Sequence, residues 1–267
     1  MKVLGVIPAR YASTRFPGKP LIDIKGKSMI QRVYEQAKKT KTLAHVIVAT
    51  DDQRIFDHVK SFGGDVIMTS SEHQSGTDRC ADVVTMLNLD VITEASEHAK
   101  QFAFDKERET PYNAVVNIQG DEPFIDPEQI DKVVGIMTAD NFSIATLAKR
   151  IDNQEDITNP NVVKVVFDDD NCALYFSRSP IPYLRNTPQY QWAKTGEFYK
   201  HIGLYCYSTK ILQDLAALEP SRLEQLESLE QLRWLQNGYM IGVGQTDLET
   251  FGIDTPEDLH VLRNAVP

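Results

Sequence analysis

The order of apolar runs along the first 68 residues constrains the fold more than any other feature of this sequence. Residues 3–7 are an apolar run with the length of a buried strand, too short to cross a membrane, and strands are also expected at 45–49 and 65–68. Amphipathic segments separate them. The first is expected to begin near Ser28, and the second is expected to be capped by Asp52. The order strand–helix–strand–helix–strand predicts right-handed βαβ units and a parallel sheet.

A basic loop follows the first of these strands. Pro8 lacks an N–H group and is expected to end the strand. The loop then alternates three cations with two small hydroxyl residues: Arg10, Ser13, Thr14, Arg15 and Lys19. Open α/β sheets bind ligands at the carboxyl ends of their strands, and guanidinium and ammonium groups suit a polyphosphate. Because the chain carries a net charge of -10, three cations on one loop favour a phosphate site over a surface loop whose arginines pair with excess acid.

This loop does not follow a standard phosphate-binding motif. Lys19 is followed by Pro20, which has no hydroxyl group, so the P-loop pattern is absent. The sequence also contains no Gly-x-Gly-x-x-Gly. We therefore expect phosphate to be bound mainly by side chains.

The overall composition excludes several classes of function. A pI near 5.1 argues against non-specific binding of nucleic acid or of an anionic membrane surface. Cys80, Cys172 and Cys206 lie far apart in apolar contexts, which indicates reduced thiols and neither a disulfide framework nor a zinc site. The apolar run at the N-terminus ends at Pro8, so we expect no signal peptide and a cytoplasmic location.

The middle of the chain continues the pattern and then changes it. We expect strands at 114–119 and 143–148, with a helix capped by Asp126 between them. After Asn159, strands at 162–167 and 172–176 flank an Asp-rich turn, and a further strand follows at 201–207. These strands predict an antiparallel lobe, about residues 160–210, appended to a mostly parallel sheet. Residues 92–112 are charge-rich and weakly periodic, which indicates an insertion in one domain of residues 1–267.

The C-terminal part is expected to return to helices and strands. One helix is predicted over 220–237, with Leu226 among its inward leucines, followed by strands at 239–243 and 251–253. Glu230 and Gln231 lie on another side of that helix, as in a core or dimer helix with a solvated face. Thr255 is the expected cap of the last helix, with Asp258 as its partner in a capping box.

Two aspartates stand where a metal ion could be held against a polyphosphate. Asp121 follows the strand at 114–119, and Asp254 precedes the last helix. If both strands belong to one sheet, both carboxylates point into the crevice that the basic loop occupies. Mg²⁺ prefers such oxygen ligands. Taken alone, each is better interpreted as a turn or capping residue, but together with the loop they predict a magnesium site.

Other polar residues allow two interpretations each. Arg79 stands near a helix start, where it could approach a phosphate or a sugar carboxylate or lie exposed. Gln119 could bind a base or a hydroxyl, or satisfy a backbone group. His201 opens a very apolar strand, where a lone histidine is more often packed than catalytic. We identify no general base.

Eight motifs recur in this order in one enzyme family. They are VIPARYASTRFPGKPL, HQSGTDR, NIQGDEPFI, NVVKVVFD, YFSRSPIPY, HIGLYCY, LEQLR and FGIDTPEDL. The chain resembles, over almost its whole length, the 3-deoxy-manno-octulosonate (Kdo) cytidylyltransferases, a branch of the CMP-sugar synthetases. This resemblance implies a Rossmann-like, three-layer α/β/α nucleotidyltransferase fold. It also implies a homodimer that associates through the antiparallel lobe and neighbouring helices.

The resemblance implies the transfer of CMP from CTP to Kdo for lipopolysaccharide synthesis, with release of pyrophosphate. The residues that match catalytic positions are Arg15, Lys19, Asp121 and Asp254, and the two aspartates match ligands of Mg²⁺. Matches to nucleotide-binding positions are Arg10, Ser13, Arg15, Lys19 and Gln119. Matches to positions in the sugar pocket are Arg79, Gln119, Arg178, His201, Tyr205, Glu230 and Gln231.

Two departures from the family pattern leave alternatives open. The insertion at 92–112 is longer than expected, and Gln74 stands where arginine is common. The second change keeps open an 8-amino analogue of Kdo as substrate. Another CMP-sugar acid synthetase is a further alternative, as is a nucleotide-binding regulator without activity, although retention of Lys19, Asp121 and Asp254 argues against the regulator.

Overall fold

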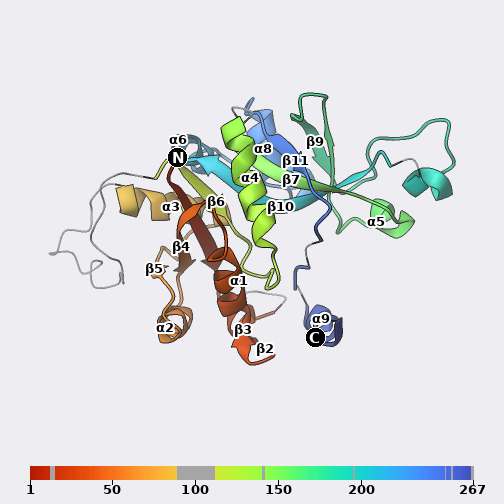
Figure 1. The fold of residues 1–267 in the computed structure, drawn as a ribbon. Helices are drawn as coiled ribbons and strands as arrows, with labels where there is room; N and C mark the ends of the chain where they lie inside the picture. The colour runs from red at the N-terminus through yellow and green to blue at the C-terminus, as the bar shows by residue number, and fades with distance from the viewer. Residues whose placement is uncertain are drawn as a thin grey trace. The chain divides into compact units, whose positions relative to one another are not determined.

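The computed structural model describes residues 1–12, 16–88, 112–139, 142–194, 196–249, 251–253 and 255–265 (Figure 1). The chain forms two compact units. The first comprises Met1–Asp131, Ser208–Ala216 and Thr250–Pro267, and the second comprises Lys132–Tyr207 and Ala217–Glu249. All of the expected insertion except Tyr112 lies outside the described residues. That the chain is one domain stays a prediction.

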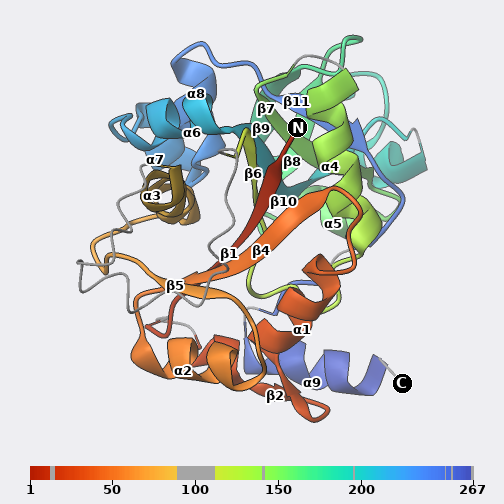
Figure 2. The same cartoon turned by 60° about the vertical axis from the view of Figure 1, so that its left-hand side comes forward.

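The sheet of the first unit is parallel, as predicted. Its strands lie in the order β6 (Ala114–Asn117), β1 (Val3–Ala9), β4 (Leu43–Thr50) and β5 (Val66–Met68), and Figure 2 shows β1 and β4 side by side. Along the chain, β1, β4 and β5 proceed in one direction across the sheet, whereas β6 lies on the other side of β1. The order therefore reverses between β1 and β6. In open α/β sheets, ligands bind at the carboxyl ends of the strands at such a reversal.

The helices of this unit begin at the positions that the sequence predicts. Ser28 Oγ accepts from Gln31 N at the start of α1 (Met29–Ala37), and Asp52 Oδ1 accepts from Arg54 N at the start of α2 (Gln53–Ser61). Thr255 and Asp258 form the reciprocal capping box of α9 (Pro256–Ala265). The remaining short elements and helices are η1 (Lys19–Leu21), β2 (Asp23–Ile24), β3 (Lys27–Ser28), α3 (Gly76–Asn88) and α6 (Thr209–Ala216).

The expected end of the first strand at Pro8 is wrong, since β1 continues to Ala9. Ile118 N donates to Val6 O, so alternate residues of β1, Pro8 among them, direct their backbone groups toward β6. The pairing with β6 ends at Val6 and Asn117. The N–H group that Pro8 lacks would therefore point to a side where no ladder remains, and proline fits there as on an edge strand.

The second unit contains the predicted antiparallel strands. β7 (Ile144–Arg150) pairs in parallel with β11 (Gly242–Gln245) and antiparallel with β10 (Tyr199–Ser208). β8 (Lys164–Phe167) and β9 (Ala173–Ser177) form the expected hairpin, whose turn contains Asn171 at φ 59°. An apolar cluster of Ile151, Ile157, Trp192 and Phe198 joins α5 (Gln154–Thr158) to η3 (Gln189–Lys194). The chain passes from the first unit to the second within α4 (Pro127–Ala139).

Three expectations for the C-terminal part are wrong. The single helix over 220–237 is two helices, α7 (Arg222–Glu227) and α8 (Gln231–Gln236), because Ser228 takes a left-handed conformation at φ 52°. Leu226 is consequently 71% exposed. The strand expected at 239–243 begins later, at Gly242, and residues 251–253 form no strand. Within the described residues, no helix is long and apolar enough to cross a membrane.

Candidate active site

A cavity of about 390 Å³ lies where the strand order of the first unit reverses. Its walls come from the segments that leave the carboxyl ends of β1 and β6. The lining residues are Pro8, Ala9, Arg10, Ala12, Lys19, Pro20, Gly76, Gln119, Gly120 and Asp121. Four residues expected at the nucleotide and metal sites, Arg10, Lys19, Gln119 and Asp121, are thus brought together. Ser13 and Arg15 lie outside the described residues.

A charge pair in this cavity joins Lys19 to Asp121. Lys19 Nζ lies 2.8 Å from Asp121 Oδ2, and the two side chains are 15% and 29% exposed. Both groups are therefore sheltered but accessible from the cavity. An ammonium beside a carboxylate at this place offers one group for phosphate oxygens and one for a cation.

The residues at Asp121 suit Mg²⁺. Asp121 Oδ1 makes no hydrogen bond to any residue in the described ranges, so this carboxylate oxygen is available as a metal ligand. Mg²⁺ is commonly held by one or two carboxylates together with substrate phosphates. Ile253 N donates to the backbone carbonyl of Asp121 at 3.0 Å, which joins the chain just before α9 to the backbone of Asp121. Asp254, the second expected ligand, lies outside the described residues, and those that are described contain no cluster of three His, Cys, Asp or Glu side chains.

Arg10 connects the basic loop to the turn before α3. Its Nη2 donates to the backbone carbonyls of His73 and Ser75, the latter at 3.4 Å. A Cβ atom at Gly76, the first residue of α3, would lie 3.2 Å from Asn117 Nδ2. The backbone of this turn therefore approaches the end of β6 closely. Gln74 is exposed, and its amide donates to Glu72 O, so it does not line the cavity.

Arg79 does not contact the cavity, contrary to the expected contact with substrate. Its side chain is fully buried, donates from Nη2 to Asp51 Oδ2 at 3.0 Å and donates from Nη1 to Thr69 Oγ1. Burial lowers the pKa of the guanidinium, and the Asp51 carboxylate opposes that shift. Arg79 thus connects the start of α3 to Asp51 and Thr69 inside the protein.

In the second unit, His201 and Tyr205 belong to an aromatic cluster. Their ring centroids are 5.3 Å apart, and the ring of Trp234 packs edge-on against Tyr205 at 5.1 Å. Burial lowers the pKa of His201 to about 3, so the imidazole is neutral at physiological pH. Burial, and then the nearby Glu230 carboxylate, raises the pKa of Tyr205.

Arg178 contacts the protein backbone rather than a cavity. Its Nε, Nη1 and Nη2 donate to the carbonyls of Glu227 (2.7 Å), Pro160 (3.0 Å) and Ser228 (3.3 Å). That it lines the sugar pocket stays a prediction. Lys164 supports the same region from inside: it is fully buried and donates to the carbonyls of Asn159, Val162 and Arg178.

This polar network holds the break between α7 and α8. The Glu227 carboxylate accepts from Ser177 Oγ at 2.6 Å and from Arg178 N at 2.9 Å. The break places Glu230 at the N-cap of α8 and Gln231, which is buried, at its first position. Sequence reasoning missed Glu227 and Lys164 as positioning residues. The partners of Glu227 lie 49 and 50 positions away in the chain, and those of Lys164 are backbone carbonyls, which no sequence pattern marks.

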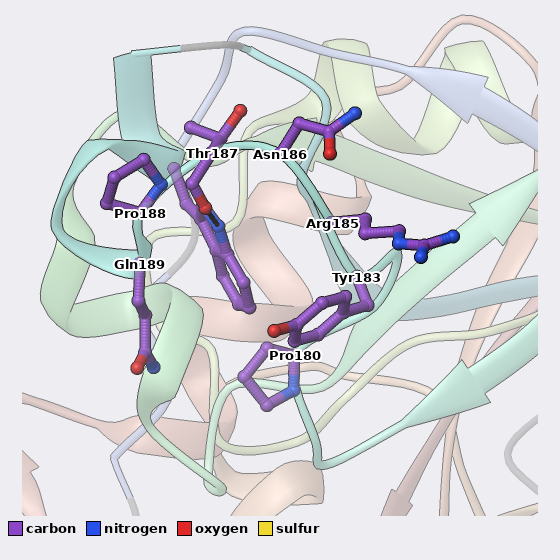
Figure 3. Close-up of a pocket in the computed structure, with 8 residues that line it drawn as sticks. Pro180, Tyr183, Arg185, Asn186, Thr187, Pro188 and Gln189 are labelled. Carbon is purple, nitrogen blue, oxygen red and sulfur yellow. Dashed lines mark hydrogen bonds between the residues drawn. The ribbon is translucent and has the colours of Figure 1, made fainter.

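A second cavity, of about 600 Å³, lies in the loop after β9 (Figure 3). Tyr183, Arg185 and Asn186 line it, and the ring of Tyr183 packs edge-on against buried Trp192 at 5.4 Å. Trp192 Nε1 donates to Thr187 O, which closes the loop on itself. No residue named in the sequence analysis as a site residue lines this cavity.

Comparison with known proteins identifies one family. The family model for cytidylyltransferases matches residues 4–243. The 3-deoxy-manno-octulosonate cytidylyltransferase of Thermodesulfovibrio yellowstonii is 52% identical over 266 residues, which cover 100% of this chain and 98% of the relative. The enzyme of the same name from Parabacteroides distasonis is 52% identical over 263 residues, covering 97% and 96%.

Solved structures agree with this result. The structure of CMP:2-keto-3-deoxy-manno-octonic acid synthetase in complex with CTP has a TM-score of 0.83 at 40% identity and covers 99% of this chain and 98% of that one. The 4-diphosphocytidyl-2C-methyl-D-erythritol synthase of Anaerococcus prevotii has a TM-score of 0.56 at 15% identity, covering 99% and 95%, and shows the fold alone. The predicted α/β fold, mostly parallel with antiparallel strands, is confirmed.

Proposed function

Because the chain belongs to the 3-deoxy-manno-octulosonate cytidylyltransferase family, we propose that it transfers CMP from CTP to the anomeric hydroxyl of Kdo. The products are CMP-Kdo, which serves lipopolysaccharide synthesis, and pyrophosphate. The observation that carries the proposal is the cavity at the carboxyl ends of β1 and β6, where Lys19 faces Asp121. A polyphosphate ligand suits this combination of an ammonium group, Arg10 and the carboxyl ends of two parallel strands.

In the proposed reaction, the anomeric oxygen of the sugar attacks the α-phosphorus of CTP. A new O–P bond forms, the bond between the α-phosphorus and the bridging oxygen breaks, pyrophosphate leaves, and the proton of the hydroxyl passes to solvent. Lys19 and Arg15 are proposed to stabilise the charge on the departing pyrophosphate. Arg10, Ser13 and Gln119 are proposed to bind the nucleotide. Such catalysis rests mainly on positioning and electrostatics.

Mg²⁺ is proposed to bind at Asp121 and Asp254. When bound, it would supply Lewis-acid activation of the hydroxyl and neutralise phosphate charge. The available Asp121 Oδ1 and the hydrogen bond from Ile253 N to Asp121 O support this proposal. Lys19, already at Asp121, is placed to neutralise the carboxylate before the substrates arrive.

For the sugar, we propose direct contacts from His201 and Tyr205, and from Glu230 and Gln231 at the N-terminus of α8. The structure favours roles for Arg79 and Arg178 in supporting the protein around the sugar rather than in contacting it. The Arg79 side chain is buried, and the Arg178 guanidinium donates to backbone carbonyls. Gln74, which kept the 8-amino analogue open, turns its amide to Glu72 O. No observation therefore favours that analogue over Kdo. A homodimer and a cytoplasmic location stay predictions.

The test is release of pyrophosphate from CTP and Mg²⁺ with Kdo, with its 8-amino analogue and with other 2-keto sugar acids. We expect release that depends on Kdo and a kcat/KM that is highest for Kdo. Release equal to that without sugar would contradict the proposed activity and support a regulator. A higher kcat/KM for another sugar acid would change the substrate while keeping the reaction.

A further inference from the structure

Strand β10 is irregular where it carries His201 and Tyr205. Ile202 pairs with Leu147 and Tyr205 pairs with Thr146, so two residues of β10 have no counterpart in β7. Four residues of a regular strand span about 13 Å. The rings of His201 and Tyr205 are nevertheless only 5.3 Å apart. The bulge therefore brings these two side chains together, as bulges commonly do when they redirect side chains near functional sites.

The hydroxyl of Thr146 fills this bulge. Thr146 is fully buried, and its Oγ1 lies 3.0 Å from Ile202 O, 2.9 Å from Leu204 O and 3.0 Å from His201 Nε2. A hydroxyl group has one proton to donate, and the two carbonyl oxygens can only accept. If the proton pointed to His201, three oxygens would face one another without a hydrogen between them. The hydroxyl therefore shares its one proton between the two carbonyls and accepts from His201 Nε2–H.

This geometry also determines the other ring nitrogen of His201. In a neutral imidazole that carries its proton on Nε2, Nδ1 is an acceptor. Among the described residues, none hydrogen-bonds to Nδ1. Burial disfavours the imidazolium and keeps the ring neutral. Trp234 Nε1 in the same cluster is buried without a hydrogen-bond partner in the described ranges, as expected where a ligand supplies the partner. Tyr205 Oη is also buried, and it faces the Thr146 hydroxyl.

We propose that Thr146 is a positioning residue that holds His201 as the Nε2–H tautomer, so that Nδ1 accepts a hydrogen bond from a hydroxyl group of the sugar. A charged contact between His201 and the sugar carboxylate is thereby excluded. The identity of the ligand rests on the proposed function, whereas the tautomer and its dependence on Thr146 do not.

The experiment compares Thr146→Val, which keeps the shape but removes the hydroxyl, with Thr146→Ser, which keeps it. Thr138→Val is the matched control, because Thr138 Oγ1 bonds only a carbonyl of its own helix. Nitrogen NMR of histidine-labelled full-length protein reports the tautomer without substrate, and loss of signals in His201→Gln assigns them. Kinetics with CTP and Kdo report KM for each substrate.

We expect a protonated Nε2 and an unprotonated Nδ1 in the wild type at pH 7, and the same in Thr146→Ser. In Thr146→Val, the His201 signals should change and KM for Kdo should rise about tenfold with KM for CTP unchanged.

A wild-type His201 that is charged or protonated on Nδ1 overturns the inference, and so does a folded Thr146→Val variant with wild-type signals and KM. If Thr146→Val does not fold, the wild-type spectrum decides. If the wild type lacks activity, the proposed function fails while the spectrum still tests the tautomer.

Discussion

Lys19 and Asp121 are 102 positions apart in the chain, yet Lys19 Nζ lies 2.8 Å from Asp121 Oδ2 at the carboxyl ends of the parallel strands. The parallel pairing of β1 with β6 causes this proximity, because it brings the segments that follow the two strands to the same end of the sheet. The pair thus places a cation and a carboxylate in one cavity.

Asp121→Asn should lower kcat by at least about 100-fold while the Kd for CTP changes little, because the lost charge acts mainly on the transition state. Steady-state kinetics and calorimetric titration with CTP measure the two effects. Asp126→Asn is the matched control: Asp126 Oδ1 caps α4, and asparagine caps equally well, so kcat should not change. An Asp121→Asn variant with wild-type kcat would refute a metal or charge role for this carboxylate.

Gly120→Ala should narrow the same cavity and destabilise the protein. A Cβ atom at Gly120 would lie 2.8 Å from Pro8 O, so the backbone at the end of β1 must move, at a cost of about 1–3 kcal/mol. KM for CTP should rise as well. Gly135→Ala is the control, since its Cβ would meet nothing within 4 Å and alanine favours a helix, giving about 0.5–1 kcal/mol of extra stability. Urea unfolding and CTP kinetics check both; equal stability of the two variants would contradict this account.

The features that the sequence predicts well are local. Asp52 and Thr255 cap their helices as expected, and a helix begins after Ser28, because capping depends on a side chain and on backbone groups two or three positions away. The proximity of Lys19 to Asp121 was also predictable. The order of strands and helices indicates a parallel sheet, in which the segments after the strands lie at the same end.

The features that the sequence does not reveal depend on distant partners. Arg79 has the local context of an exposed helix start, but Asp51 and Thr69 surround it in the fold. The break at Ser228 has no glycine or proline to indicate it and depends on the hydrogen bonds that Arg178 makes to residues 227 and 228. The hydrogen-bond partners of Thr146 lie on β10, where the pairing with β7 shifts at a bulge. The alternation of apolar and polar residues along a strand does not reveal such a shift.

Arg178→Lys distinguishes a role in the protein from direct sugar binding. Lysine cannot reproduce the planar fork that serves the carbonyls of Pro160, Glu227 and Ser228. We expect a loss of about 1–3 kcal/mol in the free energy of unfolding, because the partly buried Glu227 carbonyl loses its donor, whereas the carbonyls of Pro160 and Ser228 can bond to water. Arg185→Lys, at an exposed position, should stay within about 0.5 kcal/mol of the wild type. A stable Arg178→Lys variant with a raised KM for Kdo would favour direct contact instead.

The low pKa of His201 predicts how stability depends on pH. In the unfolded chain this histidine binds a proton below its ordinary pKa of 6.5, whereas in the folded protein it does so only near pH 3. Between these values the unfolded state holds more protons, so the free energy of unfolding falls as the pH falls from 6.5 toward 3, and above 6.5 His201 contributes no pH dependence. Glutamine at this position does not titrate. On lowering the pH from 7 to 5, the wild type should therefore lose about 2 kcal/mol more than His201→Gln.

Urea unfolding of both proteins at pH 7, 6 and 5 measures this difference directly. Comparing each protein with itself cancels the change in packing that the substitution causes at every pH. The carboxylates that titrate below pH 5 contribute to both proteins alike, so the difference between the two pH profiles isolates His201. Parallel profiles would mean that His201 takes up a proton in the folded protein near pH 6.5, which contradicts its burial as a neutral ring against Thr146.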